Sequence, residues 1–118
     1  MLDTRNTVTL ERFMDLLALR QRVTTSNIAN ADTPGYRARE VDFDWHMRTM
    51  LASSAGPRLP PMVQEVWGAG AKNDGNSVQL DRELRSLADS GIRFSLASLL
   101  LQRQIRGIRN VIREGRGG

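Results

Sequence analysis

The sequence contains no cysteine, so disulfide bonds and thiolate metal sites are excluded. Aromatic residues are also scarce, since three Phe, two Trp and one Tyr make up only 5% of the 118 residues. A compact globule normally relies on more aromatic side chains to fill its core. The scarcity therefore favours a thin core made of aliphatic contacts between helices.

Long hydrophobic runs are missing as well. No stretch approaches the roughly 18 consecutive apolar residues of a membrane-spanning helix. Residues 1–10 are polar and lack the apolar segment of a cleavable secretory signal. We therefore expect no membrane span and no cleaved signal, and composition alone suggests a cytoplasmic protein.

Positive charge is concentrated at the C-terminus. The net charge is +4, and residues 102–118 carry five Arg against one Glu, which accounts for the whole excess. Such a basic end can meet nucleic acid, acidic lipid or an acidic protein. It can equally be a solubilising helix end, where cations suit the negative pole of the macrodipole.

An amphipathic helix is predicted over residues 7–29, because its apolar positions recur at steps of three and four. The face that we expect to pack contains Leu10, Phe13, Leu17 and Ile28. Pro34 disfavours helical geometry at the residue before it, so the helix should stop near residues 29–31. Pro34 and Gly35 also suit the two central positions of a type II turn.

The last part of the chain predicts a helix of more than 30 residues with an unbroken heptad row. This heptad row consists of Leu80, Leu84, Leu87, Gly91, Phe94, Ser98, Leu101, Ile105, Ile108 and Ile112. Asn76 or Ser77 can cap its start, and the glycines from Gly115 onward should end it. Gly91 and Ser98 have two interpretations, close approach of a neighbouring helix or a tolerated weak spot.

The predicted fold class is mainly α, with the two long terminal helices paired as an antiparallel-type coiled coil around a short irregular or β insert. We divide the chain into 1–35 (first helix and turn), 36–76 (insert and linker) and 77–118 (last helix). A first helix of about 23 residues can cover only part of the last one. The remaining apolar surface should then meet another subunit, because it exceeds what a soluble monomer normally exposes.

The insert begins with an alternation of apolar and acidic residues. Val41, Phe43 and Trp45 alternate with Asp42 and Asp44, which predicts an extended segment with one apolar face. Residues 46–52 can add a helical turn. Gly, Pro, Ser and Asn then favour loops over 53–61 and 67–76, with a loose hairpin around 62–67.

One motif is highly specific. The run SNIANADTPGY at residues 26–36, followed by AREVDF at 38–43, resembles the N-terminal signature of flagellar rod and hook axial proteins. Within that family its form resembles the proximal rod type, and GNSV at 75–78 before the last helix is similar to that type's closing segment. The motif residues are Asn27, Ile28, Ala29, Asn30, Asp32, Thr33, Pro34, Gly35 and Tyr36.

The resemblance implies a structural subunit of the basal-body rod. It implies export through the flagellar type III apparatus without a cleaved signal, and assembly in the periplasm through the paired terminal helices, so that the rod transmits torque from motor to hook. The implied partners are other rod proteins, the basal-body ring and export-gate base, and further copies of this chain in a helical assembly.

Other function classes have weaker support. The single histidine, His46, has no metal-ligand spacing around it, and Asp42 with Asp44 form a solvated polar face, so we expect no enzyme, cofactor or metal site. A nucleic-acid-binding protein is an alternative because of the basic tail, but no interleaved aromatics or fold signature accompany it. A basic coiled-coil adaptor would explain the heptads and leave the turn motif unexplained.

Overall fold

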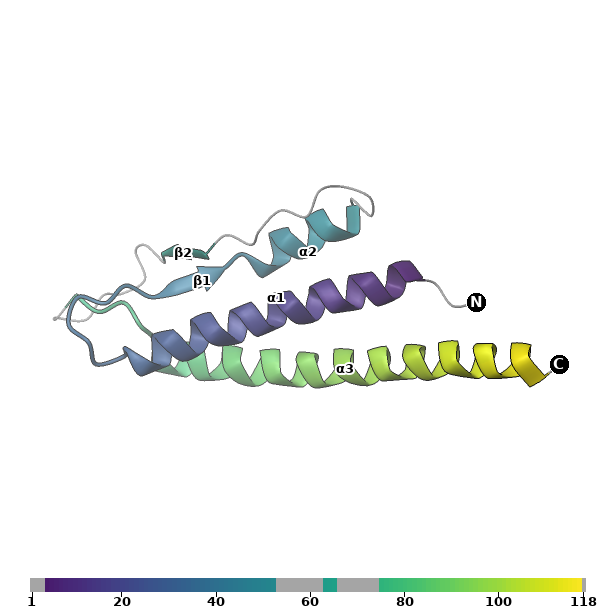
Figure 1. Cartoon of the computed structure of the whole chain (residues 1–118). Coiled ribbons are helices and arrows are strands. Elements are labelled where there is room, and N and C mark those ends of the chain that lie inside the picture. The colour runs from purple at the N-terminus through teal and green to yellow at the C-terminus, as the bar shows by residue number, and fades with distance from the viewer. Residues whose placement is uncertain (1–3, 53–62, 66–74, 118) are drawn as a thin grey trace.

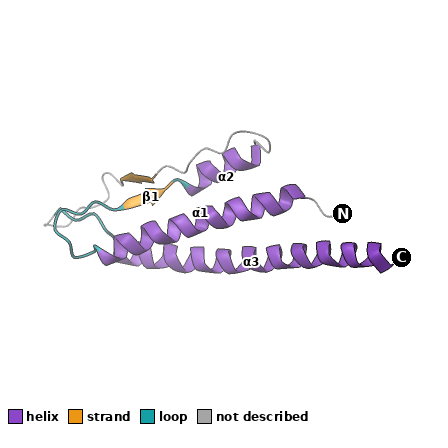
Figure 2. Cartoon of the chain, in the orientation of Figure 1, coloured by secondary structure: helices purple, strands orange, loops and turns teal. Residues whose placement is uncertain are grey.

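The computed structural model describes residues 4–52, 63–65 and 75–117. In chain order these form α1 (Thr4–Ala29), β1 (Arg39–Val41), α2 (Phe43–Ala52), β2 (Val63–Glu65) and α3 (Leu80–Gly117). Figure 2 shows two long helices with a small strand-containing insert, which confirms the predicted fold class. The predicted loops over 53–61 and most of 67–76 lie outside the described residues.

The two long helices run antiparallel, side by side, with the N- and C-terminal ends at the same end of an elongated molecule (Figure 1). The hydroxyl of Thr7, near the start of α1, donates to Gln104 Oε1 at 2.8 Å, and further along Arg20 lies 3.6 Å from Asp89. The Cα atoms extend over 71 × 26 × 14 Å. The predicted pairing of the terminal helices is therefore confirmed.

Helix α1 lies between α3 on one side and the insert on the other (Figure 1). It ends at Ala29, as Pro34 predicted, and begins three residues earlier than expected. Its residues Leu16 and Leu17 form the buried core with Val41 and Phe43. The ring of Phe13 meets that of Phe43 edge-on, with centroids 5.8 Å apart. The core is thus small and combines the rings of Phe13, Phe43 and Phe94 with aliphatic side chains.

The extended prediction for the insert is wrong beyond Val41. Strand β1 pairs with β2 in an antiparallel register that places Glu40 opposite Gln64, and α2 begins at Phe43. Asp42 caps this helix, because its Oδ1 accepts from the Trp45 amide at 3.1 Å and its carbonyl accepts from the His46 amide at 3.1 Å. Because of this cap, the segment that alternates apolar and acidic residues begins a helix instead of continuing as a strand. Trp45 then lies on the exposed side of the helix.

The predicted cap of the last helix is also wrong. Helix α3 begins at Leu80, and its first backbone bond runs from the Glu83 amide to the Gln79 carbonyl at 3.0 Å. Asn76 and Ser77 are instead buried and bond to the turn that follows α1. Helix α3 ends at Gly117, within the terminal glycines as predicted. Within the described residues, no helix combines the length and apolar character that crossing a bilayer demands.

Replacing Leu17 by alanine should remove the most enclosed side chain of the core. Leu17 has no exposed surface, so Leu17→Ala should lower the free energy of unfolding by about 2–5 kcal/mol, measured by urea denaturation with circular dichroism. Val111→Ala is the control, because Val111 is 56% exposed and should change stability by less than about 0.5 kcal/mol. Equal effects of the two substitutions would contradict this assignment of the core.

Candidate assembly surface and the turn that positions it

The turn after α1 has the predicted type II form. The Tyr36 amide donates to the Thr33 carbonyl at 3.2 Å, and Gly35 has a φ of 75°. Type II turns need this positive φ at their third residue, where glycine adopts it without strain. The turn therefore fixes the direction in which the chain leaves α1, and the insert returns along that helix.

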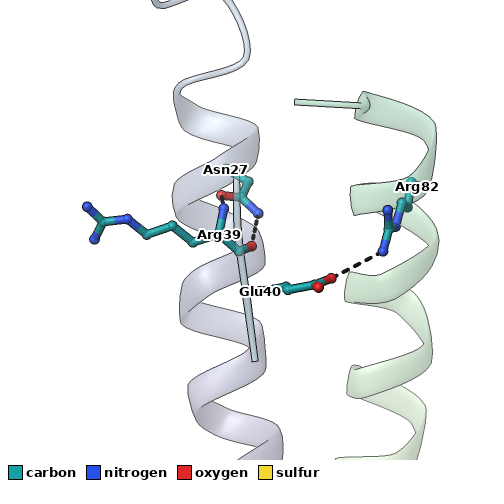
Figure 3. Close-up of polar contacts among 4 residues, drawn as sticks. All are labelled: Asn27, Arg39, Glu40 and Arg82. Carbon is teal, nitrogen blue, oxygen red and sulfur yellow. Dashed lines mark hydrogen bonds and ion pairs between the residues drawn. The ribbon is translucent and has the colours of Figure 1, made fainter. Parts of the chain in front are cut away.

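Asn27 holds the insert against α1. It lies two residues before the end of α1 and has no exposed surface. Its Nδ2 donates to the Arg39 carbonyl at 2.7 Å, and its Oδ1 accepts from the Arg39 amide at 3.0 Å (Figure 3). The same Oδ1 also accepts from the Tyr36 hydroxyl at 3.2 Å. The side chain therefore takes the place of a neighbouring strand on β1, because it satisfies both backbone groups of one strand residue.

Asn76 performs a similar task for the segment that leads into α3. It is fully buried, and its Nδ2 donates to the carbonyls of Asn30 at 2.8 Å and Thr33 at 2.7 Å. Its Oδ1 accepts from the Val78 amide at 2.8 Å. The next residue contributes as well, since the Ser77 hydroxyl accepts from the Ala38 amide at 2.8 Å. Two buried asparagines thus join α1, the insert and the start of α3.

The two glycines of this region lie against each other. Gly75 has a φ of 81°, and a Cβ built on it would stand 3.5 Å from the Cα of Gly35. The strain of any larger residue at Gly75 would come from the positive φ, because the 3.5 Å contact is ordinary van der Waals distance. The polar cluster of Asn27 and Asn76 is therefore completed by two backbone positions that favour glycine.

Ion pairs join the insert and α1 to α3. Arg82 on α3 reaches Glu40 on β1 at 3.2 Å, whereas Arg39 directs its side chain away from α3 (Figure 3). Asp89 forms ion pairs with Arg93 at 3.1 Å and with Arg20 at 3.6 Å. Arg20, Glu40, Arg82 and Asp89 line a groove of about 330 Å³ between β1, α1 and α3. Exposed ion pairs of this kind add little stability each, so the asparagines carry the connection.

The heptad row of α3 divides into two halves. Leu87, Phe94, Leu101 and Ile108 are half-buried, and Phe94 packs on the core shared by α1 and the insert. Four other members are exposed, so α1 leaves part of the row uncovered. These exposed members are Leu80, Leu84, Ile105 and Ile112.

The positions that complete the α1 contact are Ser90 and Ala97, both buried, and the half-buried Gln104. They lie one residue before Gly91, Ser98 and Ile105 of the row, so α1 sits to one side of the predicted ridge. A Cβ on Gly91 would meet Gln21 Nε2 at an ordinary 3.6 Å. Close packing of the two helices therefore does not require a glycine at this position. Of the two interpretations of Gly91, the structure favours a tolerated weak spot in the helix.

The predicted face of the first helix is correct but incomplete. Leu17 is buried, and Leu10, Phe13 and Ile28 are half-buried. Leu16 and Thr24, which belong to the same stripe of the helix, are also buried, and so is Asn27, which was predicted as a motif residue and not as part of the packed face. The available sequence signal was a polar residue, Thr24 or Asn27, on an otherwise apolar flank of the first helix. The described Arg residues of the tail, Arg103, Arg106, Arg109 and Arg113, are all exposed.

The other motif residues follow the turn. Ile28 and Ala29 close α1, and the Asn30 side chain donates back to the Ser26 carbonyl at 2.8 Å. Thr33 Oγ1 donates to Asn30 Oδ1 at 3.2 Å. Asp32 and Pro34 are exposed on the outside of the turn. The motif is therefore a local structural unit, and Asn27 is its one fully buried residue.

Comparison with known proteins agrees with this arrangement. The model of the family described as flagella basal body rod protein matches residues 14–37, the second half of α1 and the turn. The flagellar basal body rod protein FlgB of Escherichia coli K12 is 33% identical over 122 residues, covering 86% of this chain and 88% of that protein. The chain belongs to the FlgB family of flagellar basal body rod proteins.

Other FlgB proteins match over a similar share of this chain. FlgB of Yersinia enterocolitica is 32% identical, covering 86% of this chain and 89% of its own, and FlgB of Borrelia hermsii is 25% identical, covering 86% and 91%. The similarity therefore includes both long helices as well as the turn. The resemblance to the proximal rod type is confirmed.

Removing the Asn27 amide should destabilise the fold more than removing one of its partners. Asn27→Ala leaves the Arg39 amide and carbonyl without this partner and should cost about 1–3 kcal/mol in thermal or urea unfolding. Tyr36→Phe removes only the hydroxyl contacts to Asn27 and the exposed Ser26 and should cost about 1 kcal/mol or less. Asn110→Ala, at an exposed position of α3, is the control. If Asn27→Ala costs no more than this control, the clamp does not hold the insert.

Proposed function

We propose that this chain is a structural subunit of the flagellar basal-body rod, and that it polymerises through the part of the α3 surface that α1 leaves uncovered. Membership of the FlgB family supports the first half of the proposal. The second half depends on one observation, the row of exposed aliphatic residues along a helix whose other flank is packed.

The uncovered half of the heptad row reaches both ends of α3. Leu80 and Leu84 are 46% and 48% exposed at its start, and Ile112 is 51% exposed near its end. The end of α3 extends beyond the beginning of α1 (Figure 1). Exposed apolar surface of this extent on a soluble protein marks an interaction site. A rod subunit has neighbours along and around the rod, and their helices would cover this surface.

The contacts we propose are heterologous, because a patch on one subunit meets a different patch on the next and the assembly need not close. The neighbours are further copies of this chain, other rod proteins, and the basal-body ring and export-gate base. The location is the periplasmic part of the basal body, reached by type III export without a cleaved signal. The assembled rod transmits torque from motor to hook.

The relatives favour this function over the alternatives. Their names describe rod proteins, which leaves the nucleic-acid-binding protein and the adaptor without comparable support. Within the described residues, no group of three or more His, Cys, Asp or Glu side chains could hold a metal ion. The absence of a catalytic role stays a prediction.

Leu84→Asp and Ile105→Asp should each abolish rod incorporation and swimming while leaving the monomer folded. Both positions are exposed in the single chain, so circular dichroism and the unfolding midpoint of the purified variants should change little, whereas a buried charge would block the contact between subunits. Incorporation is measured in basal bodies purified from cells that carry only the variant gene.

Asn110→Asp is the matched control, since it places the same charge on an exposed position of α3 without removing an apolar side chain. Cells with this variant should swim normally. Normal swimming of cells with Leu84→Asp or Ile105→Asp would show that the exposed half of the heptad row is not the assembly surface.

A further inference from the structure

Helix α3 is longer than the helix that packs against it. It has 38 residues, whereas α1 has 26. The hydrogen bond from Thr7 to Gln104 sets the alignment of the antiparallel pair, so Thr4, the first residue of α1, lies near position 107. Residues 108–117 therefore extend beyond the described start of α1 (Figure 1). This segment, here called the overhang, is about 15 Å long.

The overhang continues the flank of α3 on which α1 packs. Ser90 and Ala97 are buried there and Gln104 is half-buried, at intervals of seven residues. Val111 is the next residue in this series, and Ile112 lies beside it. Both are apolar, but they are 56% and 51% exposed because α1 does not reach them. The flank of Val111 and Ile112, here called the open flank, is therefore suited to packing and lacks the helix that covers it elsewhere.

Positive charge borders the open flank. Arg109 and Arg113 are exposed and lie four residues apart on one side of the helix. Arg109 is three residues from Ile112, which places it about 60° away around the helix. Glu114 is the only acidic residue after Asp89 in the sequence, and it lies on the far side of the helix from Ile112. The open flank thus fits a partner that presents an acidic residue next to an apolar one.

The opposite end of the molecule presents such a surface in the turn after α1 (Figure 1). Residues 32–35, here called the tip, are all exposed and include Asp32 and Pro34. Asp32 is the only charged residue between Arg22 and Arg37. The last turn of α1 contains no basic residue, so no cation of this helix offsets its negative pole. The tip therefore combines negative charge with the apolar ring of a proline.

We propose that the tip of one copy seats on the open flank of a second copy, with Asp32 beside Arg109 and Pro34 against Ile112. The two surfaces lie at opposite ends of a molecule 71 Å long, so each copy binds one neighbour at each end and the series stays open. This inference rests on the proposed rod function. It adds a contact between the ends of the molecule to the contact along the exposed half of the heptad row, and it gives Ile112 a specific partner.

A two-fold contact between two overhangs is the alternative arrangement. It would also bury Val111 and Ile112, but it would bring Arg109 and Arg113 of both copies to one contact, with Glu114 on the far side of each helix. Like charges that face each other across an interface cost binding free energy. The tip supplies an acidic residue instead, so charge favours a contact between unlike ends.

The absence of cysteine allows a direct test by disulfide crosslinking. Thr33→Cys and Ile112→Cys are introduced into the full chain, together or separately, in flagellated cells that lack the native gene, and oxidised basal bodies are examined by non-reducing electrophoresis. The turn and the end of α3 lie at opposite ends of the molecule, so a bond between these positions joins two copies (Figure 1).

The double variant should give a ladder of three or more linked chains. A mixture of the two single variants should give linked pairs only, and each single variant alone should give none.

Three crosslinking results would overturn the proposal. Pairs formed by Ile112→Cys alone would show that two overhangs meet. A double variant that swims but gives no ladder would show that this contact does not form. An equal ladder from Ile112→Cys combined with Glu11→Cys, an exposed position of α1 far from the turn, would show that linkage is unspecific.

A charge exchange tests the proposal without cysteines, for the case in which the crosslinking variants do not assemble. Asp32→Arg and Arg109→Asp each place like charges across the contact and should reduce the number of completed basal bodies per cell by about tenfold. Their combination should restore the number. Arg103→Asp is the matched control, because Arg103 is exposed on the side of α3 opposite Ile112, and it should not rescue Asp32→Arg. Failure of the combination of Asp32→Arg with Arg109→Asp to recover would overturn the proposed pairing.

The outcome for the proposed function is separate. If Leu84→Asp and Ile105→Asp abolish rods while no ladder forms, the chain polymerises through the heptad row and the contact between the ends is wrong. If a ladder forms while Leu84→Asp still gives rods, the contact between the tip and the open flank is present and the heptad row is not the assembly surface.

Discussion

The two hydrogen bonds between the amide of Asn27 and the backbone of Arg39 hold the rest of the structure in place. They attach the insert to α1, and through Glu40 and Arg82 the insert then reaches α3. A buried amide is expensive unless all of its groups are paired, and here both its donor and its acceptor are used. The orientation of the insert therefore depends on this side chain near the end of α1, on the packing of Val41 and Phe43 against α1, and on Asn76 in the segment before α3.

The polar turn and the apolar ridge have different tasks. The turn sets the directions of α1, the insert and α3 where these three segments meet. As a result, α1 covers one flank of α3. Because α1 also packs against Val41 and Phe43 of the insert, it cannot lie centrally on the heptad row. Four members of the row stay exposed as a result, and these are the residues that we propose meet neighbouring rod subunits.

The sequence predicted the two long helices and the turn after α1 correctly. It did not predict which flank of α3 packs against α1. Periodicity predicted both helices, and Pro34 with Gly35 predicted the end of α1 and the turn, because these signals act over a few adjacent residues. Which flank of α3 would face α1 was not predictable, since Leu84 and Ile105 are as apolar as Leu87 and Ile108. Ser90 and Ala97 are small and allow α1 to pack closely on their flank of α3. Whether α1 uses this flank depends on the shape of α1 itself. The role of Asp42 was also predicted wrongly, because an acidic residue in an alternating strand and an acidic helix cap look alike in sequence.

The hydrogen bond from Thr7 to Gln104 joins residues 97 positions apart. Every contact near the open end of the hairpin likewise joins the first residues of the chain to some of the last. Such pairings form late, because the intervening chain must be confined before they can contribute. A polypeptide that emerges from a narrow opening one end at a time therefore cannot complete this pairing while either terminus is still inside. Under the export route proposed above, this topology would delay the pairing of the start of α1 with the end of α3 until both have emerged.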